Sequence, residues 1–244
     1  MRLDEFISSV SGMSKSDEAF EQMKKGLPLG KDSVGNIVLA QKRQKTLTLR
    51  HTCIAGTSRS AFIRRMLITV SCLYERAEAC FFILSPHTEY GELLRLRSMD
   101  VTVPYITNKK ELALAVDTLR ELLRQREYGV GYPHIFLVLD GLDSLPDANR
   151  NGDLEEYREI FDLFNRREDV DVISGADLTR TIFSGYPGAF LGIGNCLVSL
   201  REEGKADVTY VSDDASMSLP TPISYPSEPA VTESIIFLNS LPRD

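Results

Sequence analysis

Two short stretches of the sequence combine residue types that could bind a phosphate group and its metal ion. The first, Gly56-Thr57-Ser58-Arg59-Ser60, follows the apolar segment 52–55 and precedes an apolar-periodic segment. At a helix start, small and hydroxyl-bearing residues leave backbone N–H groups open to an anion, and Arg59 adds a positive charge. The second is Asp140, which directly follows the most apolar segment of the chain, 135–139. Its carboxylate could hold magnesium through water.

Both stretches also have a simpler structural interpretation. Gly56 permits a tight turn between a strand and a helix whether or not an anion binds there. Asp140 and Asp143 are of a type common in turns and helix caps. We take these structural roles as the default. Residues 56–60 with Asp140 remain a weak nucleotide or anion site, Asp140 remains a weak metal ligand, and no catalytic residue is assigned.

Cysteine and histidine add no further chemistry. The cysteines stand singly in apolar segments, without a Cys-x-x-Cys pair, so we interpret them as small buried residues of a reducing compartment. The histidines are scattered rather than spaced as metal ligands, and two of them are expected to be polar residues at strand edges. The cysteines are Cys53, Cys72, Cys80 and Cys196, and the histidines are His51, His87 and His134.

The composition bounds the class of protein. A chain of 244 residues with 43% apolar and 26% charged residues is typical of one globular α/β domain. No apolar run approaches the roughly 20 residues that span a bilayer. The N-terminus lacks the basic and apolar regions of a signal peptide. We therefore expect a cytoplasmic location without membrane insertion. The net charge of −7 disfavours DNA as a partner, because phosphate neutralisation dominates DNA affinity.

Apolar segments that alternate with amphipathic ones must position the candidate residues. This alternation predicts a mostly parallel sheet, in which ligands bind where the strands end. Residues 56–60, 85–89 and 140–144 would meet there. A Pro- and Ser-rich stretch at 216–229 is expected to be a loop. The expected strands are 36–40, 46–50, 52–55, 79–84, 101–106, 135–139, 170–174, 195–200 and 207–211. The expected helices are 3–25, 60–76, 89–97, 108–128 (with Asn108 as N-cap and Glu111 at the capping-box position), 153–167 and 231–241.

In this order, several segments resemble the FtsK/SpoIIIE family of P-loop ATPases, over most of the chain. They are similar to the family's opening hairpin, phosphate-binding Walker A loop, Asp-Pro-Lys strand, Walker B strand and C-terminal Pro-Gly-Ala stretch. The segments are PLGKDSVGNIVLAQ, IAGTSRSAFIRRMLITVSCLY, FFILSPHTEYGELLRL, IFLVLDGLDSL and YPGAFLGIGNCLVSL. The resemblance implies a RecA/FtsK-like three-layer α/β/α fold with an N-terminal helix and an antiparallel hairpin. It divides the chain into an N-terminal helical segment (1–26), a degenerate P-loop domain (27–226) and a C-terminal short helix or tail (227–244).

The family's catalytic positions differ in this chain. The Walker A loop is about two residues shorter than the family pattern and lacks its lysine, so Arg59 is its only cation. Gly141 stands where the family has the glutamate that activates the attacking water. Residues 85–87, Ser-Pro-His, replace Asp-Pro-Lys, and residues 175–177, Gly-Ala-Asp, replace the polar sensing residues. Together these changes imply that hydrolysis is lost.

The sequence therefore favours a catalytically inactive FtsK/SpoIIIE-like domain that serves as an interaction or assembly module, with a secretion or DNA-translocation system as its setting. It is similar to the degenerate FtsK-like domains of type VII secretion ATPases. Two alternatives stay open. One is a divergent ATPase that moves DNA or polypeptide, and the other is a non-hydrolysing nucleotide or anion sensor. We expect no cofactor, with ATP and Mg²⁺ as ligands only if the site is competent. The expected partner is another protein or further copies, in a ring or dimer.

Overall fold

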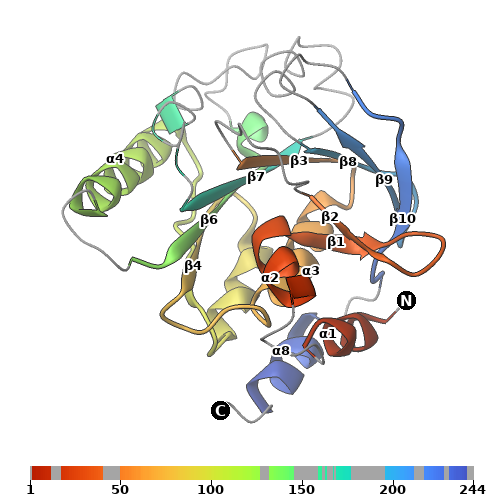
Figure 1. The fold of residues 1–244 in the computed structure, drawn as a ribbon. Helices are drawn as coiled ribbons and strands as arrows, with labels where there is room; N and C mark the ends of the chain where they lie inside the picture. The colour runs from red at the N-terminus through yellow and green to blue at the C-terminus, as the bar shows by residue number, and fades with distance from the viewer. Residues whose placement is uncertain are drawn as a thin grey trace.

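The central element of the fold is one ten-stranded sheet (Figure 1). The computed structural model describes residues 2–11, 18–40, 50–126, 132–145, 159–160, 163, 167, 169–176, 196–211, 217–227 and 231–240. The strands run in the order β2-β1-β10-β9-β8-β3-β7-β6-β4-β5. Their bounds are β1 Pro28–Lys31, β2 Ile37–Leu39, β3 Arg50–Ala55, β4 Ala79–Leu84, β5 Asp100–Thr102, β6 His134–Asp140, β7 Val170–Ala176, β8 Cys196–Leu200, β9 Lys205–Tyr210 and β10 Thr221–Ser224.

The sheet has a parallel half and an antiparallel half. The strands from β8 to β5 in this order are parallel. β9, β10, β1 and β2 extend the sheet with antiparallel pairs. In the parallel half, β7 lies between β3 and β6, so that Gly175 pairs with Ile54 on one side and Asp140 on the other. The end of β3 and the end of β6 are therefore one strand apart.

Helices cover both faces of the sheet, which makes three layers (Figure 1). Along β6, Phe136 and Val138 face a core shared with α1, α3, η1 and α8, whereas Ile135, Leu137 and Leu139 face a core shared with α4. This alternation is what a strand buried on both faces requires. The helices are α1 Leu3–Ser11, α2 Glu18–Gly26, α3 Arg59–Val70, α4 Lys109–Arg126 and α8 Val231–Ser240, with the 3-10 helices η1 Thr88–Arg95 and η2 Leu142–Ser144.

The predicted fold class is confirmed, with local differences. The hairpin of β1 and β2 is present. The single helix expected over 3–25 is instead α1 and α2, and residues 12–17 between them lie outside the described residues. α3 ends at Val70 rather than near 76, because tighter turns follow it, and β5 is shorter than expected. β10 lies inside the stretch expected to be a loop, and η1 is a 3-10 rather than an α-helix. Residues 46–49 and most of 153–167 lie outside the described part of the chain.

The start of α4 follows the expected capping pattern, and Thr107 adds to it. The Glu111 N–H donates to Asn108 Oδ1 at 3.1 Å, as an N-cap requires. The Glu111 carboxylate also accepts from Thr107, through the backbone N–H at 2.6 Å and the hydroxyl at 2.8 Å. Across the described ranges, no helix is both long and apolar enough to cross a bilayer.

Candidate functional site

The turn between β3 and α3 depends on Gly56. Its φ is +137°, in a region that L side chains rarely adopt. A Cβ added there would lie 2.8 Å from Leu200 Cβ on β8, so the turn also packs closely against its neighbour. Thr57 and Ser58 are exposed, and the Ser58 side chain makes no cap hydrogen bond to α3. The structural role expected for Gly56 is confirmed by this geometry.

Asp140 lies at the centre of a buried polar cluster rather than in a turn or cap. Its side chain is fully buried, and the Arg59 side chain is 14% exposed. Arg59 Nε donates to Asp140 Oδ1 at 2.8 Å. Ser60 Oγ and Tyr90 OH donate to Oδ2 at 2.7 and 2.9 Å. Both carboxylate oxygens therefore have donors from this chain, as a buried charge requires.

In this conformation most of the acceptor capacity of the Asp140 carboxylate is used by donors of this chain rather than left for a magnesium ion. Mg²⁺ requires oxygen ligands at about 2.0–2.1 Å in near-octahedral geometry. The hydrogen bonds from Arg59, Ser60 and Tyr90 occupy three of the roughly four acceptor sites of the Asp140 carboxylate. No cluster of three or more His, Cys, Asp or Glu residues that could hold a metal occurs in the described ranges.

Two glycines give the cluster its space. Gly175, on β7 between β3 and β6, lies beneath the ion pair. A Cβ there would be 2.0 Å from Asp140 Oδ1 and 3.2 Å from Arg59 Cδ. Gly141 follows Asp140 in a left-handed conformation, with φ +71°. A Cβ there would be 2.4 Å from His87 Nε2. His87 therefore fills the space that any side chain at position 141 would need.

His87 and Tyr90 come from the segment that follows β4. His87 Nε2 is 3.9 Å from Asp140 Oδ2, beyond hydrogen-bond distance. This nitrogen is buried and has no hydrogen-bond partner within the described part of the chain. Tyr90 is fully buried, and its burial, followed by the nearby Asp140 charge, raises its pKa well above the ordinary value. The phenol therefore stays protonated and donates to the carboxylate.

The sequence identified part of this cluster and missed the rest. The fold brings together Arg59, Ser60 and Asp140, which were all expected in the site. His87 lies in the segment 85–89 that was expected to meet the other two segments here, although it was not named as a site residue. Tyr90 was not expected, although it also follows the carboxyl end of a parallel strand, which is a signal for such a role. The side chain of Asp143 and all of Asp177 lie outside the described residues.

The remaining histidine and cysteine predictions can be checked where the structure describes them. His134 begins β6, and its Nε2 lies 2.7 Å from Asp171 Oδ2, so it is a paired polar residue at a strand edge as expected. The side chain of His51 lies outside the description. All four cysteines are free thiols. Burial raises the pKa of Cys53 to about 11 and that of Cys72 to about 12, which is typical of structural rather than reactive cysteines.

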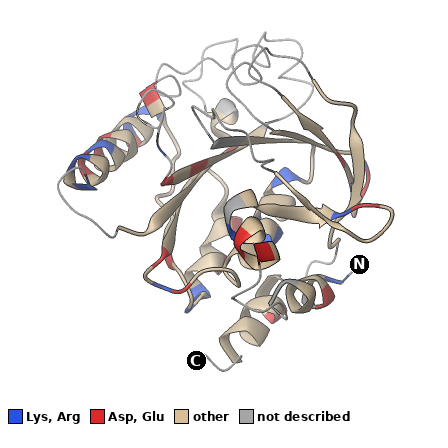
Figure 2. Ribbon diagram, viewed as in Figure 1, with Lys and Arg blue, Asp and Glu red and all other residues tan. Residues whose placement is uncertain are grey.

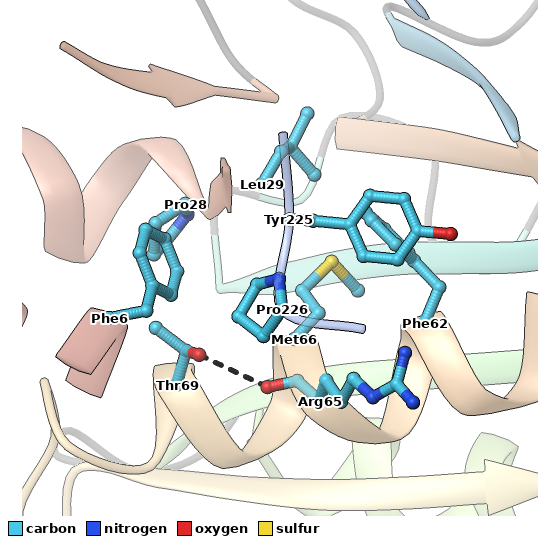
Figure 3. Close-up of a pocket in the computed structure, with 9 residues that line it drawn as sticks. All are labelled: Phe6, Pro28, Leu29, Phe62, Arg65, Met66, Thr69, Tyr225 and Pro226. Atoms are coloured by element: carbon cyan, nitrogen blue, oxygen red, sulfur yellow. Dashed lines mark hydrogen bonds between the residues drawn. The ribbon is translucent and has the colours of Figure 1, made fainter. Parts of the chain in front are cut away.

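A small cavity lies away from this cluster, where α1, β1, α3 and the segment after β10 meet (Figure 3). Its walls are mostly apolar and include Phe6, Met66 and an edge-on pair of rings, Phe62 and Tyr225, with centroids 4.7 Å apart. Its volume of about 10 Å³ is that of a single water site. This cavity is too small for a nucleotide or an organic cofactor.

Comparison with solved structures identifies proteins that share this fold. No protein-family model and no curated protein sequence matches the chain. The cytoplasmic domain of the type VII secretion ATPase EccC from Thermomonospora curvata is similar over 98% of this chain and 34% of its own, with a TM-score of 0.65 and 13% identity. EssC (ATPases 2 and 3) from Geobacillus thermodenitrificans is similar over 88% of this chain and 49% of its own, with a TM-score of 0.59 and 14% identity.

A third similar structure is T. curvata EccC (ATPases 2 and 3) in complex with a signal sequence peptide. It has a TM-score of 0.57 at 12% identity, over 84% of this chain and 41% of its own. The chain thus spans about a third to a half of the length of these relatives. These similarities confirm the fold that the sequence segments implied. The chain has the P-loop ATPase fold of the type VII secretion ATPases EccC and EssC.

Proposed function

We propose that this chain is a catalytically inactive P-loop ATPase-like module that acts by binding another protein or further copies of itself. The observation that carries the proposal is the buried ion pair of Arg59 and Asp140, which lies over Gly175. In this conformation the cation of the loop is bound to the carboxylate that would hold the metal ion.

Three requirements of phosphoryl transfer are each opposed by a named contact. A cation must reach the β- and γ-phosphates, but Arg59 Nε is bound to Asp140. A carboxylate must hold Mg²⁺, but both Asp140 oxygens accept hydrogen bonds from this chain. A base must position the attacking water, but position 141 is glycine and His87 fills the adjacent space. Restoring one group would leave the other two obstacles in place.

The sensor and ATPase alternatives both require this ion pair to open. Breaking a buried pair so that one charge is left unpaired costs about 3–5 kcal/mol. A nucleotide would have to supply that free energy, which lowers its affinity by roughly two to four orders of magnitude. The ATPase would also need a new base. The inactive module needs neither, so we favour it.

A protein-binding role agrees with the mixed charges on the surface of α4 and with a peptide complex of one similar structure. One of the similar EccC structures is a complex with a signal sequence peptide, so a protein that contains this fold binds polypeptide. Figure 2 shows basic and acidic residues interspersed along α4 rather than gathered by sign. With a net charge of −7, this distribution favours protein over DNA as the partner.

Phosphate release from ATP in the presence of Mg²⁺ tests the inactive state. We expect the wild-type chain to release no more phosphate than the Asp140→Ala variant purified in parallel. Ser60→Ala serves as a milder control, because it removes one donor from Asp140 and keeps the ion pair. Turnover in the wild type that persists through purification and is abolished by Asp140→Ala would contradict the proposal.

A further inference from the structure

A groove lies between the hairpin of β1 and β2 and the helices α1 and α2, and we call it the hairpin groove. Its volume is about 360 Å³, the size of a site for a small molecule or a short length of polypeptide. None of the residues of the Asp140 cluster lines it. Its apolar wall is formed where α2 packs on the hairpin, by Met23, Ile37 and Leu39. Its polar side chains are Ser9, Gln22, Lys31 and Asn36.

The polar side chains of the hairpin groove offer a ligand mainly acceptors and one positive charge. The Ser9 hydroxyl donates to a backbone carbonyl of its own helix at 2.7 Å. The amide nitrogens of Gln22 and Asn36 each donate to a neighbouring carboxylate at 3.1 Å, which leaves their carbonyl oxygens to accept. Lys31 is half-buried, and its ammonium has no ion pair or hydrogen bond within the described ranges. A matching ligand therefore donates from N–H groups and carries a negative charge.

The strand beside the groove is an apolar sheet edge. Among the described strands, β2 is the outermost on this side and pairs only with β1. Its sequence, Ile37-Val38-Leu39, has neither the charge nor the proline that often protects an edge strand. Asp32 Oδ1 accepts from two backbone N–H groups of the hairpin turn at 3.0 and 2.9 Å, and Tyr210 OH donates to the Leu39 carbonyl at 2.6 Å. Because these bonds hold the edge in place, an extended chain can pair with it at low entropic cost.

We propose that the hairpin groove binds an extended, acidic stretch of polypeptide from a partner protein, which pairs with β2 and places a carboxylate against Lys31. Polypeptide is the ligand class that supplies all the features the groove requires. Its backbone N–H groups match the free acceptors, its apolar side chains match Met23 and Ile37, and an acidic side chain matches the unpaired ammonium. This inference deepens the proposed protein-binding role and rests on it, because it names the surface and the chemistry of the partner.

Fluorescence anisotropy of two labelled peptides with the full chain tests this site. One peptide alternates valine with glutamate, and the other alternates valine with lysine. We expect saturable binding of the glutamate peptide only. Because the net charge of the chain is −7, nonspecific attraction would instead favour the lysine peptide.

Two charge reversals localise the attraction. Lys31→Glu should weaken binding of the glutamate peptide at least tenfold. Lys110→Glu is the matched control, because Lys110 is exposed on α4 and does not line the groove. It should bind the glutamate peptide like the wild type. Circular dichroism establishes that each variant is folded.

Nuclear magnetic resonance of labelled methionine methyl groups places the bound peptide. Met23 lines the hairpin groove, whereas Met66 lines the separate small cavity of Figure 3. The Met23 signal should shift when the glutamate peptide is added, and the Met66 signal should stay.

The proposal is overturned if the glutamate peptide does not bind, or if both peptides bind equally well. Equal affinities of Lys31→Glu and Lys110→Glu, or an unchanged Met23 signal in the bound state, would overturn it too. These outcomes are separate from catalysis. ATP turnover would contradict the proposed inactivity and leave the peptide site unaffected, whereas failure of peptide binding would remove this surface and leave the inactivity unaffected.

Discussion

Replacing Gly141 by alanine should destabilise the protein in a way that depends on His87. Two costs are expected. A non-glycine residue at φ +71° costs about 1–2 kcal/mol, because the left-handed conformation disfavours a Cβ. The added Cβ would also lie 2.4 Å from His87 Nε2, and such overpacking typically costs about 1–3 kcal/mol. We therefore expect Gly141→Ala to lower the free energy of unfolding by about 2–5 kcal/mol.

The two costs can be separated by a double-mutant cycle. In a His87→Ala background the overpacking disappears, so Gly141→Ala should cost only the conformational part. The coupling between the two positions is then about 1–3 kcal/mol. Gly35→Ala is a matched control, because Gly35 has φ +91° but nothing within 4 Å of its Cβ position. It should cost about 1–2 kcal/mol in either background.

Urea unfolding followed by circular dichroism gives these free energies, and an unchanged denaturant slope confirms that the states compared are alike. The reasoning is refuted if Gly141→Ala costs the same with and without His87. That result would mean that the imidazole turns away freely and does not fill the space of a side chain at position 141.

Three further predictions concern the cluster and its surroundings. Gly175→Ala should lower the free energy of unfolding in urea by about 3–5 kcal/mol, because the added Cβ would separate Arg59 from Asp140. A decrease below about 1 kcal/mol would contradict this expectation. Tyr90→Phe keeps the ring but removes the hydrogen bond from the phenol to the Asp140 carboxylate. It should lower the free energy of unfolding in urea by about 1.5–3 kcal/mol. An unchanged unfolding midpoint would mean that this hydrogen bond is not formed. Burial opposes ionisation of Asp169, but hydrogen bonds and charges from Arg167 and Arg126 outweigh it and lower its pKa. The stabilisation that the Asp169 carboxylate gives the folded protein is therefore complete above its pKa in the unfolded chain, near 3.8, and is lost as pH falls through its lower pKa in the folded protein. The free energy of unfolding should consequently fall less on acidification in Asp169→Asn than in the wild type.

The fold could be predicted because its signals are local. Ile135–Leu139 and Ala79–Leu84 are apolar runs long enough to be strands buried on both faces, and amphipathic segments separate them. β10 was missed because it is a strand of four residues with a single buried side chain, Ile223, inside a Pro-rich stretch. Its pairing with β9 is what makes it a strand, and no local pattern specifies that partner.

The site was less predictable because it depends on register between distant strands. The sequence identified Arg59 and Asp140 as candidates, but not that they bind each other. That contact exists because β7 places Gly175 between β3 and β6, where it leaves room for both side chains. Gly141 was interpreted as the loss of a catalytic group. The structure adds that the position also accommodates His87, whose ring comes from the end of another strand.

Calorimetric titration of the wild-type chain with ATP and Mg²⁺ tests the central claim most directly, because it asks whether the pair of Arg59 and Asp140 opens for a nucleotide. A closed site predicts no heat beyond dilution up to millimolar nucleotide. Saturable binding with a micromolar dissociation constant, absent in Asp140→Ala, would contradict the account and show that the loop still holds phosphate.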